Sequence, residues 1–254
     1  PRQTGTPSTP HTTPHAPSDA KPLTRARARA RAEVPAPIPA AAATRLASDG
    51  ATGLSLRAVA RDVGMVSSAI YRYFPSRDAL LTALIVDAYD RLGETTETAV
   101  AASSASAPAQ RWVEAAMTIR AWALDHREDY ALLYGTPVPG YAAPDDTVAP
   151  GTRVTRALVG IVADAARQGR LAPPRGVTEP AVDPANRGSF DALRSELDLD
   201  VPDGVVLWVI AAWTQLFGLL TFELFGQTRH LVADDAALFR DAAHAMATRI
   251  GLPD

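Results

Sequence analysis

The chain has 254 residues, of which 47% are hydrophobic and 21% are charged. It is therefore long enough for two packed units and too apolar for a disordered protein. It has no cysteine, which excludes disulfides, thiolate metal sites and cysteine nucleophiles. The net charge of −3 does not indicate a nucleic-acid-binding protein, but the charge is unevenly distributed. Most acidic residues lie in the second half, and a basic run near the N-terminus suits contact with phosphate; it consists of Arg25, Arg27, Arg29 and Arg31.

Residues 1–33 are predicted to be a disordered basic arm, rich in proline and threonine and without the apolar region of a secretory signal. Prolines at 35, 37 and 39 disfavour a helix there, so the first helix is expected to begin no earlier than Pro39. The arm either lies along the DNA backbone or minor groove, or is a solvated basic tail. We expect two units after it, residues 34–94 and residues 95–254.

Residues 44–82 have the pattern of a helix-turn-helix. The first helix is expected to end at 48–50, where Gly50 can adopt a positive φ. Ser55 is placed to cap a second helix at 56–63, and Gly64 lies where the chain must reverse. A third helix at 67–74 ends at Pro75, and Ser76 is placed to cap a long fourth helix.

The short third helix is the expected DNA-reading element, because its neighbours hold it with its first turn free to enter a major groove. Small side chains at Ser67, Ser68 and Ala69 allow close approach to base edges. Four further side chains are placed to reach phosphates or bases: the hydroxyls of Tyr71 and Tyr73 and the guanidinium groups of Arg57 and Arg77.

The rest of the chain is predicted to be helical, with no convincing strand alternation, so the fold class is all-α. Apolar stripes predict helices at 109–126, around 130–134, around 154–165, at 205–224 and at 236–250. Residues 135–146 and 172–188 are rich in glycine and proline, and the second of these stretches is expected to be a mobile loop.

Residues 204–222 carry no charge and are long enough to span a bilayer. Thr214 and Gln215 within the run, Glu223 at its end and the lack of flanking basic residues favour a helix buried in a core or a dimer interface. A membrane-tethered regulator is the alternative interpretation.

The run GLSLRAVARDVGMVSSAIYRYFPSRDALL closely resembles the TetR (tetracycline-repressor-like) family over roughly residues 39–89. Residues 130–144 and 208–226 resemble the WHG-type C-terminal domain of that family. The resemblance implies a homodimer whose last two long helices form a four-helix bundle, and a ligand cavity in the C-terminal domain. It places base reading at Arg57, Ser67, Ser68 and Ala69, and phosphate contacts at the Leu56 backbone N–H, Tyr71, Tyr73 and Arg77. Relatives often have Ser or Thr at position 56, and Leu56 has no hydroxyl to offer.

Most of the aromatic residues lie in the second unit, where they either fill the core or line an apolar effector cavity. The candidate effector-binding set is Trp112, Thr118, Trp122, Tyr134, Trp213, Gln215 and Phe217. No catalytic motif, metal-ligand spacing or cofactor-binding motif is found, so we expect no enzyme activity, no metal and no cofactor.

The expected function is a cytoplasmic bacterial repressor that binds a palindromic operator in double-stranded DNA as a dimer and is released by a small lipophilic effector. A ligand-independent DNA-organising protein, whose second half serves only to dimerise, remains the alternative.

Overall fold

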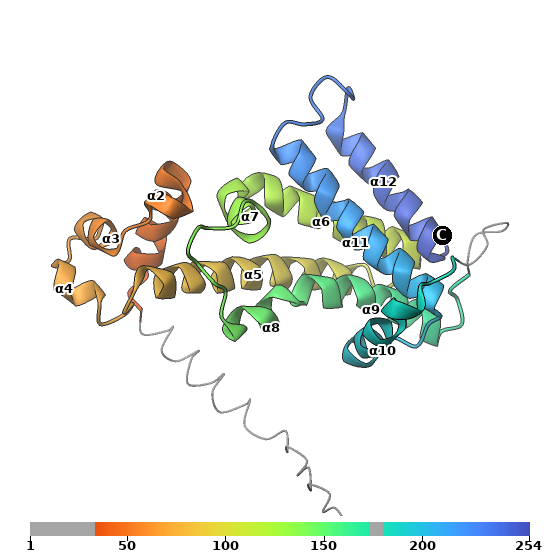
Figure 1. The fold of residues 1–254 in the computed structure, drawn as a ribbon. Helices are drawn as coiled ribbons and strands as arrows, with labels where there is room; N and C mark the ends of the chain where they lie inside the picture. Colours follow the sequence, from red (N-terminus) through yellow and green to blue (C-terminus); the bar gives the residue numbers. More distant parts are fainter. Residues whose placement is uncertain (1–33, 173–179) are drawn as a thin grey trace, which may run out of the picture.

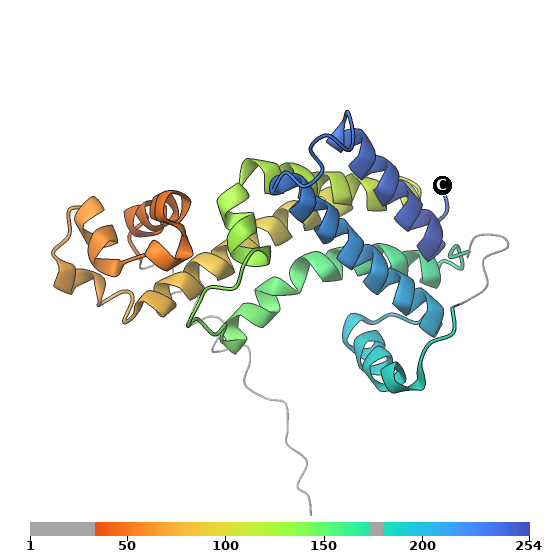
Figure 2. The same ribbon diagram turned by 45° about the horizontal axis from the view of Figure 1, so that its top comes forward.

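The computed structural model describes residues 34–172 and 180–254. The predicted basic arm, with its four arginines, lies outside these residues, as does part of the predicted loop at 172–188. Within the described residues the secondary structure is helical and contains no strand, which confirms the all-α prediction. A small group of helices lies at one end of a long helix, α5, further helices pack along the rest of it, and the last three helices pack on the outside of those (Figures 1 and 2).

The N-terminal unit consists of α2 (Pro37–Gly53), α3 (Leu56–Asp62), α4 (Ser67–Ile70) and the first turns of α5 (Arg77–Ala102). The second unit contains α6 (Pro108–Asp125), α7 (Arg127–Tyr134), the 3-10 turn η1 (Asp145–Thr147), α8 (Val148–Gly151), α9 (Arg153–Arg167), α10 (Pro184–Leu197), α11 (Asp203–Leu224) and α12 (Asp235–Ile250). Because α5 runs without interruption through residue 94, both units share it.

Helix α2 begins at Pro37, two residues before the predicted limit, so that prediction was wrong. The first-turn N–H groups of a helix have no partner within it, so prolines at these positions remove no hydrogen bond. The predicted end is partly right. Gly50 has a φ of 68°, as expected, but the chain makes a further helical turn to Gly53.

Two helical caps were predicted at serines in the N-terminal unit. Ser76 caps α5, because its hydroxyl accepts a hydrogen bond from the N–H of Ala79 at 3.1 Å. Ser55 has the extended backbone of a cap residue, but its hydroxyl caps nothing. Helix α4 is also shorter than the predicted 67–74 and continues as a turn, in which the Phe74 N–H donates to the Ile70 carbonyl at 3.0 Å.

Helix α10 overturns the prediction of a loop through residue 188, since it begins at Pro184. Its start is fixed by Asp183, whose carboxylate accepts a hydrogen bond from the Ala185 N–H at 2.9 Å. Phe190 is the buried anchor of this helix and packs into the C-terminal core. A single buried residue gives little periodicity, and for this reason the apolar pattern did not reveal the helix.

Helix α11 is long and apolar enough to cross a membrane. Its most apolar 18-residue stretch has a mean hydropathy of 1.9, and 39% of this stretch is buried inside the protein. Its inner face belongs to the C-terminal core, as Leu216 and Leu220 show by their complete burial. The opposite face is uncovered: Phe222 on it is 57% exposed, Thr214 is exposed as well, and Phe225, directly after the helix, is 52% exposed. Large exposed apolar surface on a helix of this kind is typical of an interaction site.

A buried tyrosine links α7 to α11 inside the core. The Tyr130 hydroxyl donates to the Phe217 carbonyl and shares a hydrogen bond with the Thr221 hydroxyl, both at 3.1 Å. Burial raises the pKa of Tyr130 to about 12. Burial also raises the pKa of its neighbour Tyr134, whose ring centroid lies 5.1 Å away.

We expect a loss of stability at alkaline pH from this tyrosine pair. A raised pKa in the folded state means that the unfolded chain loses the proton first, so the stabilisation is complete below pH 10 and is lost as pH rises toward 12. Denaturant midpoints at pH 9 and pH 11 measure the effect. Tyr130→Phe should show a smaller decrease than the wild type between these values, and an equal decrease would contradict the assignment.

Candidate DNA interface

The α3–α4 pair forms a tight helix-turn-helix. The chain reverses at Gly64, whose φ is 69°, and the Met65 N–H then donates to the Ala60 carbonyl at 2.8 Å. Val59 and Ile70 are fully buried and hold the two helices on the core of the N-terminal unit. The packing therefore fixes α4, which is too short to be stable alone.

Most of the predicted DNA-contacting residues lie on the surface of this unit. Arg57, Ser67 and Ser68 are exposed, and Ala69 is half-buried. Tyr71 is 45% exposed and Tyr73 is 36% exposed, so both aromatic side chains are accessible to a partner. The set offers a guanidinium and small hydroxyls on one helix pair and phenols in the turn that follows it, the groups that contact base edges and phosphates in a major groove.

Leu56 and Arg77 are placed differently. Leu56 has its side chain in the core, 5% exposed, so only its backbone N–H could meet a phosphate. No side chain caps the start of α3, which leaves that N–H without a capping partner. Arg77 donates to the Ala51 carbonyl at 2.6 Å and pairs with Asp78 at 3.4 Å, so it already braces α5 against the end of α2.

A second brace, which sequence reasoning missed, joins α2 to α3. The Arg45 guanidinium donates to both carboxylate oxygens of Asp62, at 2.5 and 2.9 Å, and to Asp49 at 3.0 Å. The hydrogen bond with Arg45 lowers the pKa of Asp62 and raises that of Arg45. The spacing of 17 residues between these partners has no helical periodicity that could have predicted the contact.

The structure brings together three of the predicted effector residues. The ring centroids of Tyr134 and Phe217 are 4.5 Å apart, and those of Trp213 and Phe217 are 5.5 Å apart. The other four are placed separately. Trp112 is fully buried, Trp122 stacks on His126, the Thr118 hydroxyl is bonded to its own helix at Glu114, and Gln215 is exposed.

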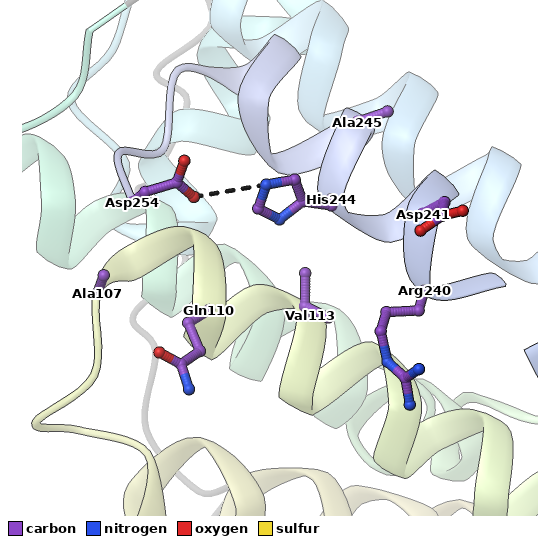
Figure 3. A pocket seen from close by; sticks show the side chains of 8 residues that line it. All are labelled: Ala107, Gln110, Val113, Arg240, Asp241, His244, Ala245 and Asp254. Carbon is purple, nitrogen blue, oxygen red and sulfur yellow. Dashed lines mark ion pairs between the residues drawn. The ribbon is translucent and has the colours of Figure 1, made fainter. Parts of the chain in front are cut away.

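Two pockets in the described part of the chain are lined by residues other than the predicted effector residues. The larger, of about 640 Å³, is an open groove between α6 and α12, where His244 lies 3.6 Å from Asp254 (Figure 3). The smaller, of about 350 Å³, lies between the starts of α2 and α5. Among the described residues, no group of three His, Cys, Asp or Glu side chains could hold a metal ion.

The turn between α3 and α4 favours glycine at position 64 because of its backbone conformation and not because space is lacking. A Cβ at Gly64 would meet nothing within 4 Å, but the φ of 69° is unfavourable for other residues. We expect Gly64→Ala to lower the free energy of unfolding by about 1–2 kcal/mol in denaturant titrations. Gly160→Ala is the matched control, since that position is helical and equally open; an equal effect at both sites would refute the argument.

Comparisons with known proteins agree with this geometry. The family model for bacterial regulatory proteins of the tetR family matches residues 38–84, and the model for the tetracyclin repressor-like C-terminal domain matches residues 112–246. The HTH-type transcriptional regulator Rv1816 of Mycobacterium tuberculosis is 38% identical over 199 residues, which cover 78% of this chain and 83% of the relative.

Two solved structures share the fold over most of the chain. The crystal structure of the regulatory protein SCO4313 is 34% identical, with a TM-score of 0.65, and the match covers 88% of this chain and 97% of that one. A protein of unknown function from Rhodococcus sp. RHA1 is 27% identical, with a TM-score of 0.62 and coverage of 86% and 94%. The chain therefore belongs to the TetR family of bacterial transcriptional regulators.

Proposed function

We propose that the protein is a cytoplasmic repressor that binds a palindromic operator as a homodimer and is released by a small lipophilic effector. The observation that carries the proposal is the surface of the α3–α4 pair. There Arg57 on α3 and Ser67 and Ser68 on α4 are exposed, and so are the two phenols in the turn after α4. The core of the N-terminal unit holds both helices in place.

The proposed DNA contacts divide into two kinds. Arg57, Ser67, Ser68 and Ala69 would read bases, because their side chains are small or can donate directionally. Tyr71, Tyr73 and the Leu56 N–H would contact phosphates and fix the register. Arg77 would contribute through its brace on Ala51, or by exchanging that carbonyl for a phosphate.

The proposed dimer uses the uncovered face of α11 together with α12. Four residues of α11 recur at three- and four-residue spacing and so share one face: Ala211, Thr214, Gly218 and Phe222. Phe225 follows directly after the helix. A Cβ at Gly218 would meet nothing within 4 Å, so a partner helix could approach closely there. A symmetric contact of this kind would place the two α4 helices on one side of the DNA, about 34 Å apart.

The proposed effector site would lie among the aromatic residues of the C-terminal core. Trp112 supports it, because its indole N–H is buried and has no hydrogen-bond partner in the described part of the chain. Leaving such a donor unsatisfied costs about 1–3 kcal/mol, and a ligand oxygen would recover this. RolR, a structural neighbour at 16% identity, was crystallised with resorcinol; at this identity the likeness supports only the fold.

The first test selects binding sequences from random DNA duplexes with the purified full chain at low salt. We expect a two-fold symmetric consensus, a stoichiometry of two chains per duplex by native mass spectrometry, and an affinity that falls steeply with salt. A selection that yields no consensus would contradict the proposal.

A ligand-independent DNA-organising protein is the second candidate, and one observation favours it. Trp112, Trp122 and Phe217 are packed in the core, and the two pockets described above are lined by other residues. Thermal-shift screening against lipophilic compounds separates the two candidates. Stabilising compounds that also weaken operator binding support the repressor, whereas their absence from a broad library supports the second candidate.

A further inference from the structure

The segment after α7 crosses α5 and reaches the N-terminal unit. We call residues 135–144 the strap; it joins α7 to η1 and passes over α5 (Figures 1 and 2). The strap folds back on itself at a turn in which the Tyr141 N–H donates to the Val138 carbonyl at 3.1 Å. Both Val138 and Tyr141 pack against the core of the N-terminal unit.

One hydrogen bond fixes the strap to α5. The hydroxyls of Tyr141 and Thr82 are 3.0 Å apart and partly buried. Thr82 lies in the second turn of α5, immediately beside Leu80 and Leu81, which are completely buried in the N-terminal core. The bond therefore attaches the strap to α5 beside the core of the N-terminal unit.

The other end of the strap is held by α7, which packs on α11. Tyr130 is hydrogen-bonded to α11 at Phe217 and Thr221, and Tyr134 lies against Phe217. Leu133, between them, packs against both the N-terminal and the C-terminal cores. A continuous series of contacts therefore connects α11 to α7, and the strap connects α7 to Thr82 on α5.

We infer that Tyr141 is a positioning residue for DNA binding. Its hydrogen bond to Thr82 sets the angle between the helix-turn-helix and α11, and with it the distance between the two reading helices of a dimer. This inference rests on the proposed dimeric function. Apart from α5 itself, the N-terminal unit is held by α7, whose Leu132 and Leu133 pack against its core, and by the strap. The Tyr141–Thr82 bond is the side-chain hydrogen bond of this second attachment, away from the axis of α5.

The test measures that distance directly, without DNA. The chain has no cysteine, so Arg61→Cys, on the exposed surface of α3, accepts a spin label at a single site in each chain. Double electron–electron resonance then gives the distribution of distances between the two labels of a dimer. We expect Tyr141→Phe and Thr82→Val each to broaden this distribution, and the double variant to broaden it no further.

A matched control removes a hydroxyl from the same helix. Thr95→Val deletes a hydroxyl that bonds only within α5, to the Arg91 carbonyl at 2.8 Å, and should leave the distribution unchanged. If Tyr141→Phe and Thr82→Val leave the width of the distance distribution unchanged while the dimer is intact, the inference is overturned but the proposed function is not. A sample without any intermolecular distance would mean that no dimer forms, and would overturn the proposed function as well.

A second readout uses DNA duplexes whose half-sites are separated by spacers that differ by one base pair. We expect Tyr141→Phe to bind the optimal spacing about fivefold more weakly, the equivalent of one hydrogen bond, and to discriminate less among spacings. Affinity for a single half-site should be unchanged. A wild-type spacing profile would count against the inference, because a variant that is merely less stable keeps its spacing preference.

Discussion

Replacing Glu223 by alanine should lower the free energy of unfolding by about 3–5 kcal/mol, since it leaves a charge buried without its partner. The Arg120 guanidinium, on α6, donates to both carboxylate oxygens of Glu223 on α11, with Nε to Oε2 at 2.8 Å. The two side chains are only 13% and 11% exposed. Denaturant titration of the variant against the wild type measures the loss.

Two control variants distinguish the cost of leaving a buried charge unpaired from the cost of losing any ion pair. Glu196→Ala removes an exposed pair with Arg156, whose side chains are 56% and 49% exposed, and should cost at most about 1 kcal/mol. The double variant Arg120→Met, Glu223→Leu removes both charges and should recover most of the stability. A small loss in Glu223→Ala, similar to that of Glu196→Ala, would show that the pair is hydrated in solution.

Replacing Gly218 by glutamate should abolish the dimer while leaving the protomer folded. The position is helical, and a Cβ there would meet nothing within 4 Å in its own chain. In a symmetric interface it would instead bring two like charges against apolar surface, and we expect association to weaken at least about 100-fold. Sedimentation velocity measures the assembly, and operator binding should fall with it.

Gly160→Glu provides the matched control for that variant. It places the same side chain at another open helical glycine, on α9, away from the proposed interface. We expect it to remain dimeric and to bind DNA like the wild type. If Gly218→Glu also stays dimeric, the uncovered face of α11 is not where the copies meet.

The helix-turn-helix could be predicted from sequence because its determinants are local. Gly64 at the reversal, Ser76 at the cap of α5 and the apolar spacing each act within a few residues, and the structure confirms them. The start of α2 was misplaced because only Pro39 was expected in the first turn, whereas the helix begins at Pro37 and its first turn holds both prolines. Helix α10 was missed because Phe190 is the only buried residue in it, while Leu193 and Leu197 are only partly buried against the core.

Features that depend on long-range contacts were beyond the sequence. The Arg45–Asp62 brace, the engagement of Arg77 with Ala51 and the Tyr141–Thr82 bond join residues 17, 26 and 59 positions apart. A polar side chain at such a separation looks like any surface residue until the fold is known. The effector residues remain a prediction for a related reason, since periodicity reveals a buried aromatic ring but not whether it meets protein or ligand.

The most direct test of DNA reading by α3 and α4 compares footprints and affinities on the selected operator for wild type, Arg57→Ala and Arg187→Ala. Both arginines are exposed, but Arg187 lies on α10, far along the chain from the helix-turn-helix. We expect Arg57→Ala to lose about 1–3 kcal/mol of binding free energy and to relax the sequence preference at one position of each half-site. Arg187→Ala should bind like the wild type. Equal affinities and identical footprints for all three proteins would contradict the assignment of α3 and α4 as the DNA-reading helices.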